Sequence, residues 1–205
     1  MIRKEKIEEL ESYINELKTL EITEIDNSGK GFLGVKRYSC LLNNGKTIIR
    51  EKIVKSGKDG SAAIILPITN KGNVLLVVQP RVFKPTTVGV EFPAGYIEEN
   101  EDPIESAKRE LEEETGYICD DLVLLAKYYQ DSGCSSAFNH CFLALNCKKD
   151  KNQHLDKDEY VRYFECTFDE VLELEKLGYI NGANPIIAIE KAKTYLDNKK
   201  IKLVR

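Results

Sequence analysis

The chain has 205 residues, of which 42% are hydrophobic, and its 30 Lys and Arg against 34 Asp and Glu give a net charge of −4. This hydrophobic fraction supports a packed core and excludes global disorder. The acidic balance disfavours a mainly nucleic-acid-binding protein, because such proteins usually carry a basic excess. No apolar run reaches the length of a membrane-spanning helix, so we expect no membrane partner either.

The first 60 residues predict a helix followed by a β-hairpin. Apolar side chains recur at helical spacing over residues 3–19. Residues 31–42 and 46–54 are typical of strands, and the Asn43-Asn44-Gly45 turn between them favours a hairpin. The polar, glycine-rich segment 56–60 is the best candidate for a domain boundary. We therefore predict an N-terminal unit, residues 1–57, before a main domain, residues 58–205.

The start of the chain lacks the apolar centre of a signal peptide, and its six cysteines contain no CxxC pair. We therefore expect reduced thiols in a cytoplasmic protein.

The main domain mixes short strands with helices. The predicted strands are residues 62–68, 73–78, 88–92, 121–130, 137–146 and 160–167, and the predicted helices are residues 103–115, 168–177 and 184–198. This order predicts an α/β (α+β) fold in which helices sandwich a mixed sheet.

The net negative charge of the chain comes from one short segment. Residues 98–114 contain nine acidic and two basic side chains, a local charge of −7, so the remaining residues sum to +3. The helix predicted at 103–115 lies within this region. Asp102 suits its N-cap and Pro103 its first position, and Glu105 would close a capping box. Gly116 suits the residue after the helix, where a left-handed backbone is favoured.

Two faces are predicted for this helix. Ile104, Ala107 and Leu111 form an apolar stripe that would pack on a sheet. Glu110, Glu113 and Glu114 stand at i, i+3 and i+4 and share one face, where like charges repel. A divalent cation such as Mg²⁺ or Mn²⁺ would reverse the sign of that interaction, because these ions prefer oxygen ligands. A solvated charged face is the simpler alternative.

Neighbouring residues add to the acidic face. Arg109 precedes Glu113 by four residues and could pair with it, and Glu101 could fold back toward the same cluster.

The segment GYIEENEDPIESAKRELEEETGY, residues 95–117, resembles the Nudix box, G-x5-E-x7-R-E-U-x-E-E-x-G-U with U aliphatic. The matching residues are Gly95, Glu101, Arg109, Glu110, Leu111, Glu113, Glu114 and Gly116. Tyr117 is the one departure, at the final aliphatic position. Seven fixed identities would match by chance with a probability on the order of 10⁻⁸ per window.

The resemblance implies a Nudix α/β/α sandwich and an enzyme that cleaves the pyrophosphate of a nucleoside diphosphate linked to another moiety. It implies Mg²⁺, with Mn²⁺ as a substitute, held by Glu110, Glu113, Glu114 and the backbone carbonyl of Ala94. Arg109 would orient the glutamates.

A general base is also implied, from the acidic loop before the strand at 160–167. Glu159 is our choice, with Asp158 as the alternative. Glu113, Glu159 and Arg109 thus form the expected catalytic set.

Two segments outside the box resemble the ADP-ribose pyrophosphatase branch of the family. The first, residues 79–95, implies that Arg81 and Glu91 contact the substrate. The second, residues 128–144, implies the same for Gly133 and Ser135. This second segment lacks the proline that many members of the branch carry, so GDP-mannose and other nucleoside diphosphate sugars remain open as substrates.

Three further expectations complete the sequence analysis. A homodimer is expected, because an isolated two-stranded hairpin is marginally stable and relatives in this branch pair their N-terminal strands. The alternative enzymes are Nudix hydrolases of a dinucleoside polyphosphate, a modified dNTP or a coenzyme. The alternative from another class is a Nudix module that senses nucleotide sugars without cleaving them.

Overall fold

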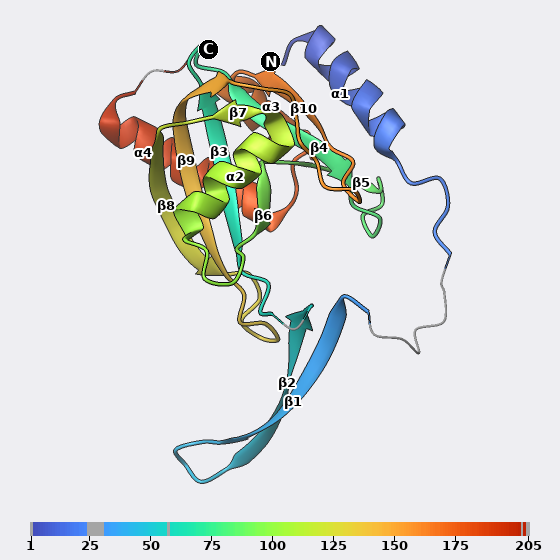
Figure 1. Cartoon of the computed structure of the whole chain (residues 1–205), viewed down its shortest axis with the longest axis vertical. Helices are drawn as coiled ribbons and strands as arrows, with labels where there is room; N and C mark the ends of the chain where they lie inside the picture. Colours follow the sequence, from blue (N-terminus) through green and yellow to red (C-terminus); the bar gives the residue numbers. More distant parts are fainter. Residues whose placement is uncertain (1, 24–30, 57, 202, 204–205) are drawn as a thin grey trace.

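The computed structural model describes residues 2–23, 31–56, 58–201 and 203, and within these ranges the chain forms four helices and ten strands (Figure 1). The helices are α1 (Lys4–Leu17), α2 (Pro103–Thr115), α3 (Phe168–Lys176) and α4 (Ala183–Lys199). The strands are β1 (Leu33–Leu41), β2 (Thr47–Lys55), β3 (Ala62–Thr69), β4 (Val74–Pro80), β5 (Val88–Glu91), β6 (Ala94–Tyr96), β7 (Tyr117–Ile118), β8 (Asp121–Tyr129), β9 (Phe138–Lys149) and β10 (Arg162–Cys166). None of these helices is long and apolar enough to cross a membrane.

A mixed sheet forms the centre of the main domain. Its strands follow the order β10-β4-β3-β9-β7, with β5 beside β4, β6 beside β3 and β8 beside β9. The pair β3–β9 is parallel and the other pairs are antiparallel. The predicted mixed α/β sandwich is therefore confirmed.

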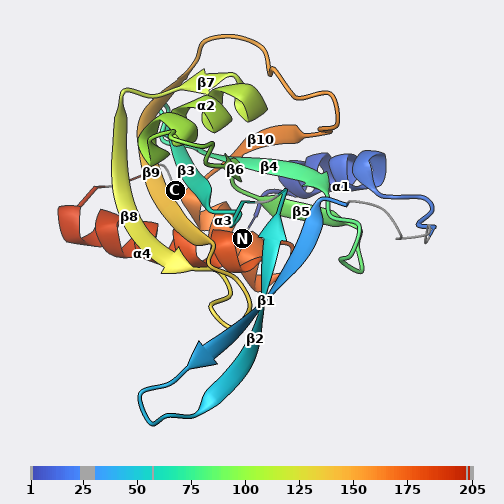
Figure 2. The ribbon, with the colours of Figure 1, turned by 60° about the horizontal axis from the view of Figure 1, so that its bottom comes forward.

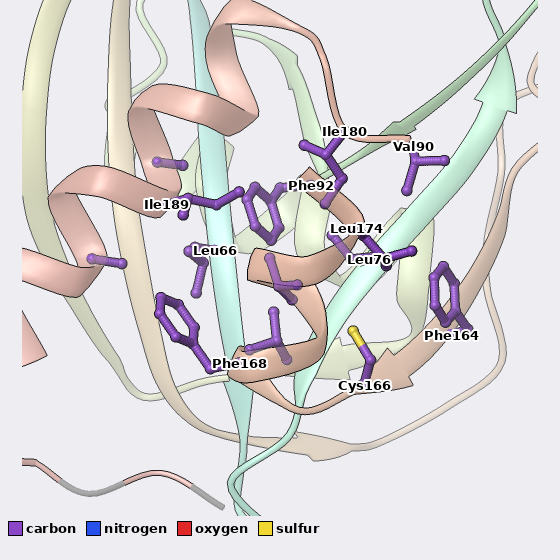
Figure 3. Close-up of a cluster of buried hydrophobic side chains, with 14 of the residues drawn as sticks. Leu66, Leu76, Val90, Phe92, Phe164, Cys166, Phe168, Leu174, Ile180 and Ile189 are labelled. Atoms are coloured by element: carbon purple, nitrogen blue, oxygen red, sulfur yellow. The ribbon is translucent and has the colours of Figure 1, made fainter. Parts of the chain in front are cut away.

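Strand β3 is buried on both sides, and its alternating side chains supply two cores. Ile64 and Leu66 face the larger core, which α3 and α4 cover, as Figure 3 shows around Leu66. Ala63 and Ile65 face the smaller core, which Ala107 and Leu111 of α2 complete. Helix α2 thus packs on the opposite side of the sheet from α4 (Figure 1).

The two N-terminal elements lie in different places. Helix α1 packs against the main domain through Leu10 and Leu17, both buried in the larger core. The β1–β2 hairpin projects away from the sheet (Figures 1 and 2). Residue 57, the last residue of the predicted N-terminal unit, lies outside the described residues, and the division at 57/58 stays a prediction.

The ends of α2 agree with the sequence in most respects. The Asp102 side chain accepts a hydrogen bond from the Ile104 N–H at 2.7 Å. Gly116 has φ 70°, and a Cβ there would clash with the Lys151 carbonyl, so both the conformation and the contact require glycine.

Two details of the first turn of α2 were predicted wrongly. Ile104 is 43% exposed, because the buried face of α2 begins only with Ser106 and Ala107. Glu105 pairs with Lys108 at 2.9 Å instead of closing the capping box, because this cation lies one turn along the helix.

Arg3 ties the start of the chain to α3. Its guanidinium donates two hydrogen bonds to Glu170, at 2.7 and 3.0 Å. The Glu170 side chain also accepts from the Thr167 N–H in the capping box of α3. These bonds, led by that from Arg3, lower the pKa of Glu170 to about 2.

We expect Arg3→Met to lower the free energy of unfolding by about 1–2 kcal/mol at pH 7. This is the usual contribution of a charge-assisted hydrogen bond, reduced because Arg3 is partly exposed to solvent. Because the pKa of Glu170 is lower in the folded than in the unfolded chain, its ionised form stabilises the folded protein above the unfolded pKa of about 4.3. This stabilisation is lost as the pH falls through the folded pKa. The loss caused by Arg3→Met should therefore shrink between about pH 4.5 and pH 2. Urea unfolding across this range measures it. Lys4→Met, which removes an exposed pair with Glu8, is the control, and an equal, pH-independent loss in both variants would contradict the assignment.

Candidate functional site

A cleft of about 550 Å³ opens between α2, the ends of β4 to β6, the loop before β10 and the start of α4. Most of the candidate residues from the sequence line it. The candidates that do so are Arg81, Glu91, Ala94, Arg109, Glu110, Glu113, Glu114 and Glu159. The topology has thus brought together residues that are up to 78 positions apart in the chain.

Two carboxylates of α2 are buried at this cleft. Glu110 is 7% exposed and Glu114 is 2% exposed. The backbone N–H of Ala94 donates to Glu114 at 3.1 Å. A Cβ at Gly95 would overlap the Glu110 carboxylate. Glycine at this position of β6 therefore leaves room for the Glu110 carboxylate, which would have to move if residue 95 carried a side chain.

Burial makes these carboxylates unusually weak acids. Desolvation raises the pKa of Glu110 to about 7, although Arg109 acts in the opposite direction. Desolvation, together with the nearby charge of Glu110, holds the pKa of Glu114 well above its usual range. The ionised forms of Glu110 and Glu114 are therefore both disfavoured in the absence of a cation, and a bound cation would stabilise them.

Arg109 holds the remaining acids in place. Its guanidinium donates to Glu101 at 2.9 Å, to Glu110 at 2.6 Å and to Glu113 at 3.0 Å. The predicted pairing with Glu113 and the return of Glu101 toward the cluster are both confirmed. The hydrogen bond to Arg109 also lowers the pKa of Glu101.

The donor set suits a hard divalent cation, since it offers carboxylate oxygens in a desolvated place. Among the described residues, however, no three His, Cys, Asp or Glu side chains already converge as metal ligands would. Glu110 and Glu113 are instead hydrogen-bonded to Arg109. The chemistry of the residues fits Mg²⁺, while the ligand assignment stays a prediction.

Arg81 and Glu91 lie at another wall of the cleft. Arg81 donates two hydrogen bonds to Glu91, at 2.9 and 2.7 Å, across the β4–β5 pair. This bidentate contact fixes the plane of the guanidinium. Two residues earlier, Gln79 lines the same cleft with a buried amide nitrogen that makes no hydrogen bond among the described residues.

The loop before β10 places Glu159 at the cleft. Glu159 is exposed, and its carboxylate accepts from the Asp156 N–H of its own loop at 3.1 Å. Asp156, which the sequence analysis did not single out, also lines the cleft.

The start of α4, with Asn184 and Pro185, lines the cleft as well. Helix α4 therefore has two roles, since it also packs on the core through Ala188 and Ile189. Its N-terminus presents the positive end of the helix dipole to this region, a feature that favours anions.

Gly133 and Ser135 are not among the residues that line this cleft. Their loop instead meets the hairpin, where the Ile53 N–H donates to the Cys134 carbonyl at 2.8 Å. Their substrate contacts stay a prediction.

Comparison with known proteins identifies relatives for most of the chain. The NUDIX domain family model matches residues 58–186. The chain is 37% identical over 151 residues to the methanol dehydrogenase activator of Bacillus methanolicus, and 36% identical over 151 residues to the ADP-ribose pyrophosphatase of Bacillus subtilis. Each of these alignments covers 73% of this chain and 78% of the relative.

Relatives with lower sequence identity also match most of the chain. A GDP-mannose pyrophosphatase of Escherichia coli is 28% identical over 169 residues, which cover 77% of this chain and 85% of the relative. A crystal structure of an ADP compounds hydrolase superposes with a TM-score of 0.72 at 21% identity, over 89% of this chain and 96% of that one. This last likeness supports the fold alone.

The burial of Glu114 predicts an effect on stability that is separate from activity. A raised folded-state pKa means that the ionised group opposes folding at any pH above the unfolded pKa of about 4.3. Without metal at pH 8, Glu114→Gln should therefore raise the melting temperature, by about 2–4 °C for each kcal/mol relieved in a chain of this size. Added Mg²⁺ should then stabilise the wild type but not the variant.

Thermal melts in EDTA and in Mg²⁺ measure both effects. Glu112→Gln is the matched control, because Glu112 lies on the same helix but pairs with Lys151 away from the cleft. Equal stabilisation of wild type and Glu114→Gln by Mg²⁺ would exclude Glu114 as a ligand.

Proposed function

The chain belongs to the Nudix family and is a Nudix pyrophosphohydrolase, and from this premise we propose that it hydrolyses the pyrophosphate bond of ADP-ribose or a related nucleoside diphosphate sugar with the help of Mg²⁺. The products are a nucleoside monophosphate and a sugar phosphate. The observation that supports this most strongly is the buried pair Glu110 and Glu114 in a cleft that also holds Arg81. Such a cleft suits a cation and the polyanion that the cation binds.

The relatives favour one substrate class. The chain is 36% identical to a protein named ADP-ribose pyrophosphatase and 28% identical to proteins named GDP-mannose pyrophosphatase. ADP-ribose is therefore the first candidate, and GDP-mannose the second.

We assign Glu110, Glu113, Glu114 and the Ala94 carbonyl to the metal. When bound there, Mg²⁺ would neutralise the pyrophosphate oxygens and lower the pKa of a coordinated water. Arg109 keeps the carboxylates oriented through its hydrogen bonds to Glu110 and Glu113.

The other walls of the cleft bind the substrate and move the proton. Arg81, its plane fixed by Glu91, is suited to bind a phosphate or the second sugar. Glu159 is suited to accept the proton of the attacking water, since its carboxylate is exposed at the cleft. It would first have to leave its contact with the Asp156 N–H.

Two alternatives differ from this proposal in substrate or in class. One is a Nudix hydrolase of a dinucleoside polyphosphate, a modified dNTP or a coenzyme. The other is a module that binds a nucleotide sugar without cleaving it, which the complete set of box carboxylates disfavours.

A substrate panel with Mg²⁺ tests the proposal. We expect ADP-ribose or another nucleoside diphosphate sugar to give the highest kcat/KM, with nucleoside monophosphate and sugar phosphate resolved by anion-exchange chromatography. Glu114→Gln should lower kcat/KM by more than about 100-fold, which is the upper end for losing an outer-shell partner of a metal site.

Glu112→Gln is the control on the same helix and should remain within about threefold of the wild type. A preference for dinucleoside polyphosphates or dNTPs would support the first alternative. Tight binding of nucleotide sugars without turnover would support the second.

We also propose that the chain forms a homodimer through the β1–β2 hairpin. Leu33, Val35 and Leu41 alternate along β1, and they are 62%, 67% and 75% exposed. The register places Ile49 opposite Ser39, so its exposed side chain lies on this same face. Arg37 and its partner Glu51 also lie on this face, between the two apolar ends. Exposed apolar side chains grouped at both ends of a charged pair suit a protein–protein contact.

Size-exclusion chromatography with light scattering should return twice the chain mass of 23.3 kDa. Val35→Glu should weaken the dimer at least tenfold, equivalent to about 1.4 kcal/mol. Lys36→Glu, on the opposite face of the same strand, is the control for added negative charge. A wild-type mass of 23.3 kDa at micromolar concentration would contradict the dimer.

A cytoplasmic location is proposed from the cysteines, since all six are free thiols in the structure.

A further inference from the structure

The loop between β9 and β10 brings Glu159 to the cleft, although most of this loop is exposed. An exposed loop of about a dozen residues would by itself hold a side chain loosely. The position of Glu159 therefore depends on how the base of the loop is attached.

The start of this loop is attached to the C-terminal end of α2. Helices end with carbonyl groups that have no partner within the helix. Here the His154 N–H donates to the Glu113 carbonyl at 2.8 Å, and the Lys149 ammonium donates to the Thr115 carbonyl at 2.7 Å. The Asp150 N–H donates to the Gly116 carbonyl at 3.0 Å.

Gln153 adds a connection through its side chain. Its side-chain amide donates to the Glu114 carbonyl and also to the Val161 carbonyl, at 3.3 Å for the latter. Val161 is 2% exposed and directly precedes β10. One half-buried amide thus joins the beginning of the loop, its end and the backbone of Glu114.

We propose that Gln153 is a positioning residue that fixes Glu159 relative to the carboxylates of α2. Glu159 lies between the two attachment points, and only two residues before Val161. Because Gln153 holds the backbone of Glu114, it couples the position of Glu159 to the same residue whose carboxylate faces the cleft. This inference rests on the proposed function, in which Glu159 accepts a proton and Glu114 binds metal.

A purely structural role for Gln153 predicts different results from a positioning role. Structural loss would lower stability and reduce activity by the same factor whether or not Glu159 is present. A positioning residue acts through Glu159, so its removal should matter only while Glu159 can act.

The experiment is a double-mutant cycle with Gln153→Met and Glu159→Gln in the full-length chain. Methionine has a similar shape to glutamine but lacks the N–H donors. Gln153→Met should lower kcat by about 10–100-fold, the range typical of losing a side chain that orients a functional group through a hydrogen bond, with KM changed less than threefold. In the Glu159→Gln background the same substitution should change kcat less than twofold.

A second readout is independent of turnover. Amide hydrogen exchange followed by mass spectrometry should become about 10-fold faster over residues 154–160 in Gln153→Met, because two hydrogen bonds at the base of the loop are lost. Binding of Mn²⁺ alone should stay within about threefold of wild type, because the carboxylates of α2 remain. His154→Ala is the control, since the bond from His154 uses its backbone N–H and should persist.

Equal effects of Gln153→Met in both backgrounds, or unchanged exchange over the loop, would overturn the inference. If Gln153→Met does not fold, Gln153→Asn, one methylene shorter, should show the same exchange result. Failure of the proposed function is distinguishable, because it would appear in the wild type as no turnover of any nucleoside diphosphate sugar, while the exchange measurement still decides the role of Gln153.

Discussion

The site depends on the burial of two carboxylates, Glu110 and Glu114, on one side of a single helix. Placing two ionisable acids in a desolvated region is unfavourable, and their raised pKa values express this cost. A part of the cost is offset by Arg109 and by the Ala94 N–H. A divalent cation bound there would offset the remainder, because its charge would attract both carboxylates and counter their mutual repulsion.

The surrounding fold serves to hold this helix in place. Ala107 and Leu111 fix α2 on the sheet, and Asp102 and Gly116 define its two ends. Gly95 lets strand β6 approach the Glu110 carboxylate closely. The loop before β10 then occupies the free carbonyls at the C-terminal end of the helix. The packing of helices on both faces of a mixed sheet thus places a short acidic segment along one wall of the cleft.

Sequence patterns predicted most of the fold, because long elements repeat their periodicity often enough to be recognised. The predicted limits of α2 and α4 are within one residue of those observed. Strands β6 and β7, with three and two residues, are too short to show alternation. Ile104 was misassigned because helical spacing gives the apolar face but not where along the helix the sheet begins.

Within the site, the shared face of Glu110, Glu113 and Glu114 could be predicted because their spacing along one helix fixes which side chains lie together, while the resemblance to the box implied the other members. Arg81, Glu91 and Glu159 lie outside that helix and were expected near it only through the family resemblance. Other contacts that depend on tertiary structure could not be predicted. The start of α4 reaches the cleft only through the packing of the whole chain. Gln153 donates to two backbone carbonyls. Every residue has such a carbonyl, so the sequence does not indicate which ones a side chain will contact. Tyr117, the one departure from the box, donates to Glu165 of β10 at 2.6 Å, a contact that no aliphatic residue could make.

The most direct test of the central claim is to locate the cation. Crystals of the wild-type chain grown with Mn²⁺ and a non-hydrolysable ADP-ribose analogue should show anomalous scattering beside Glu110 and Glu114, with the pyrophosphate of the analogue in contact with the metal. Density for the analogue with no anomalous peak at these carboxylates, or a peak held by other residues, would contradict the view that their burial exists to bind a metal.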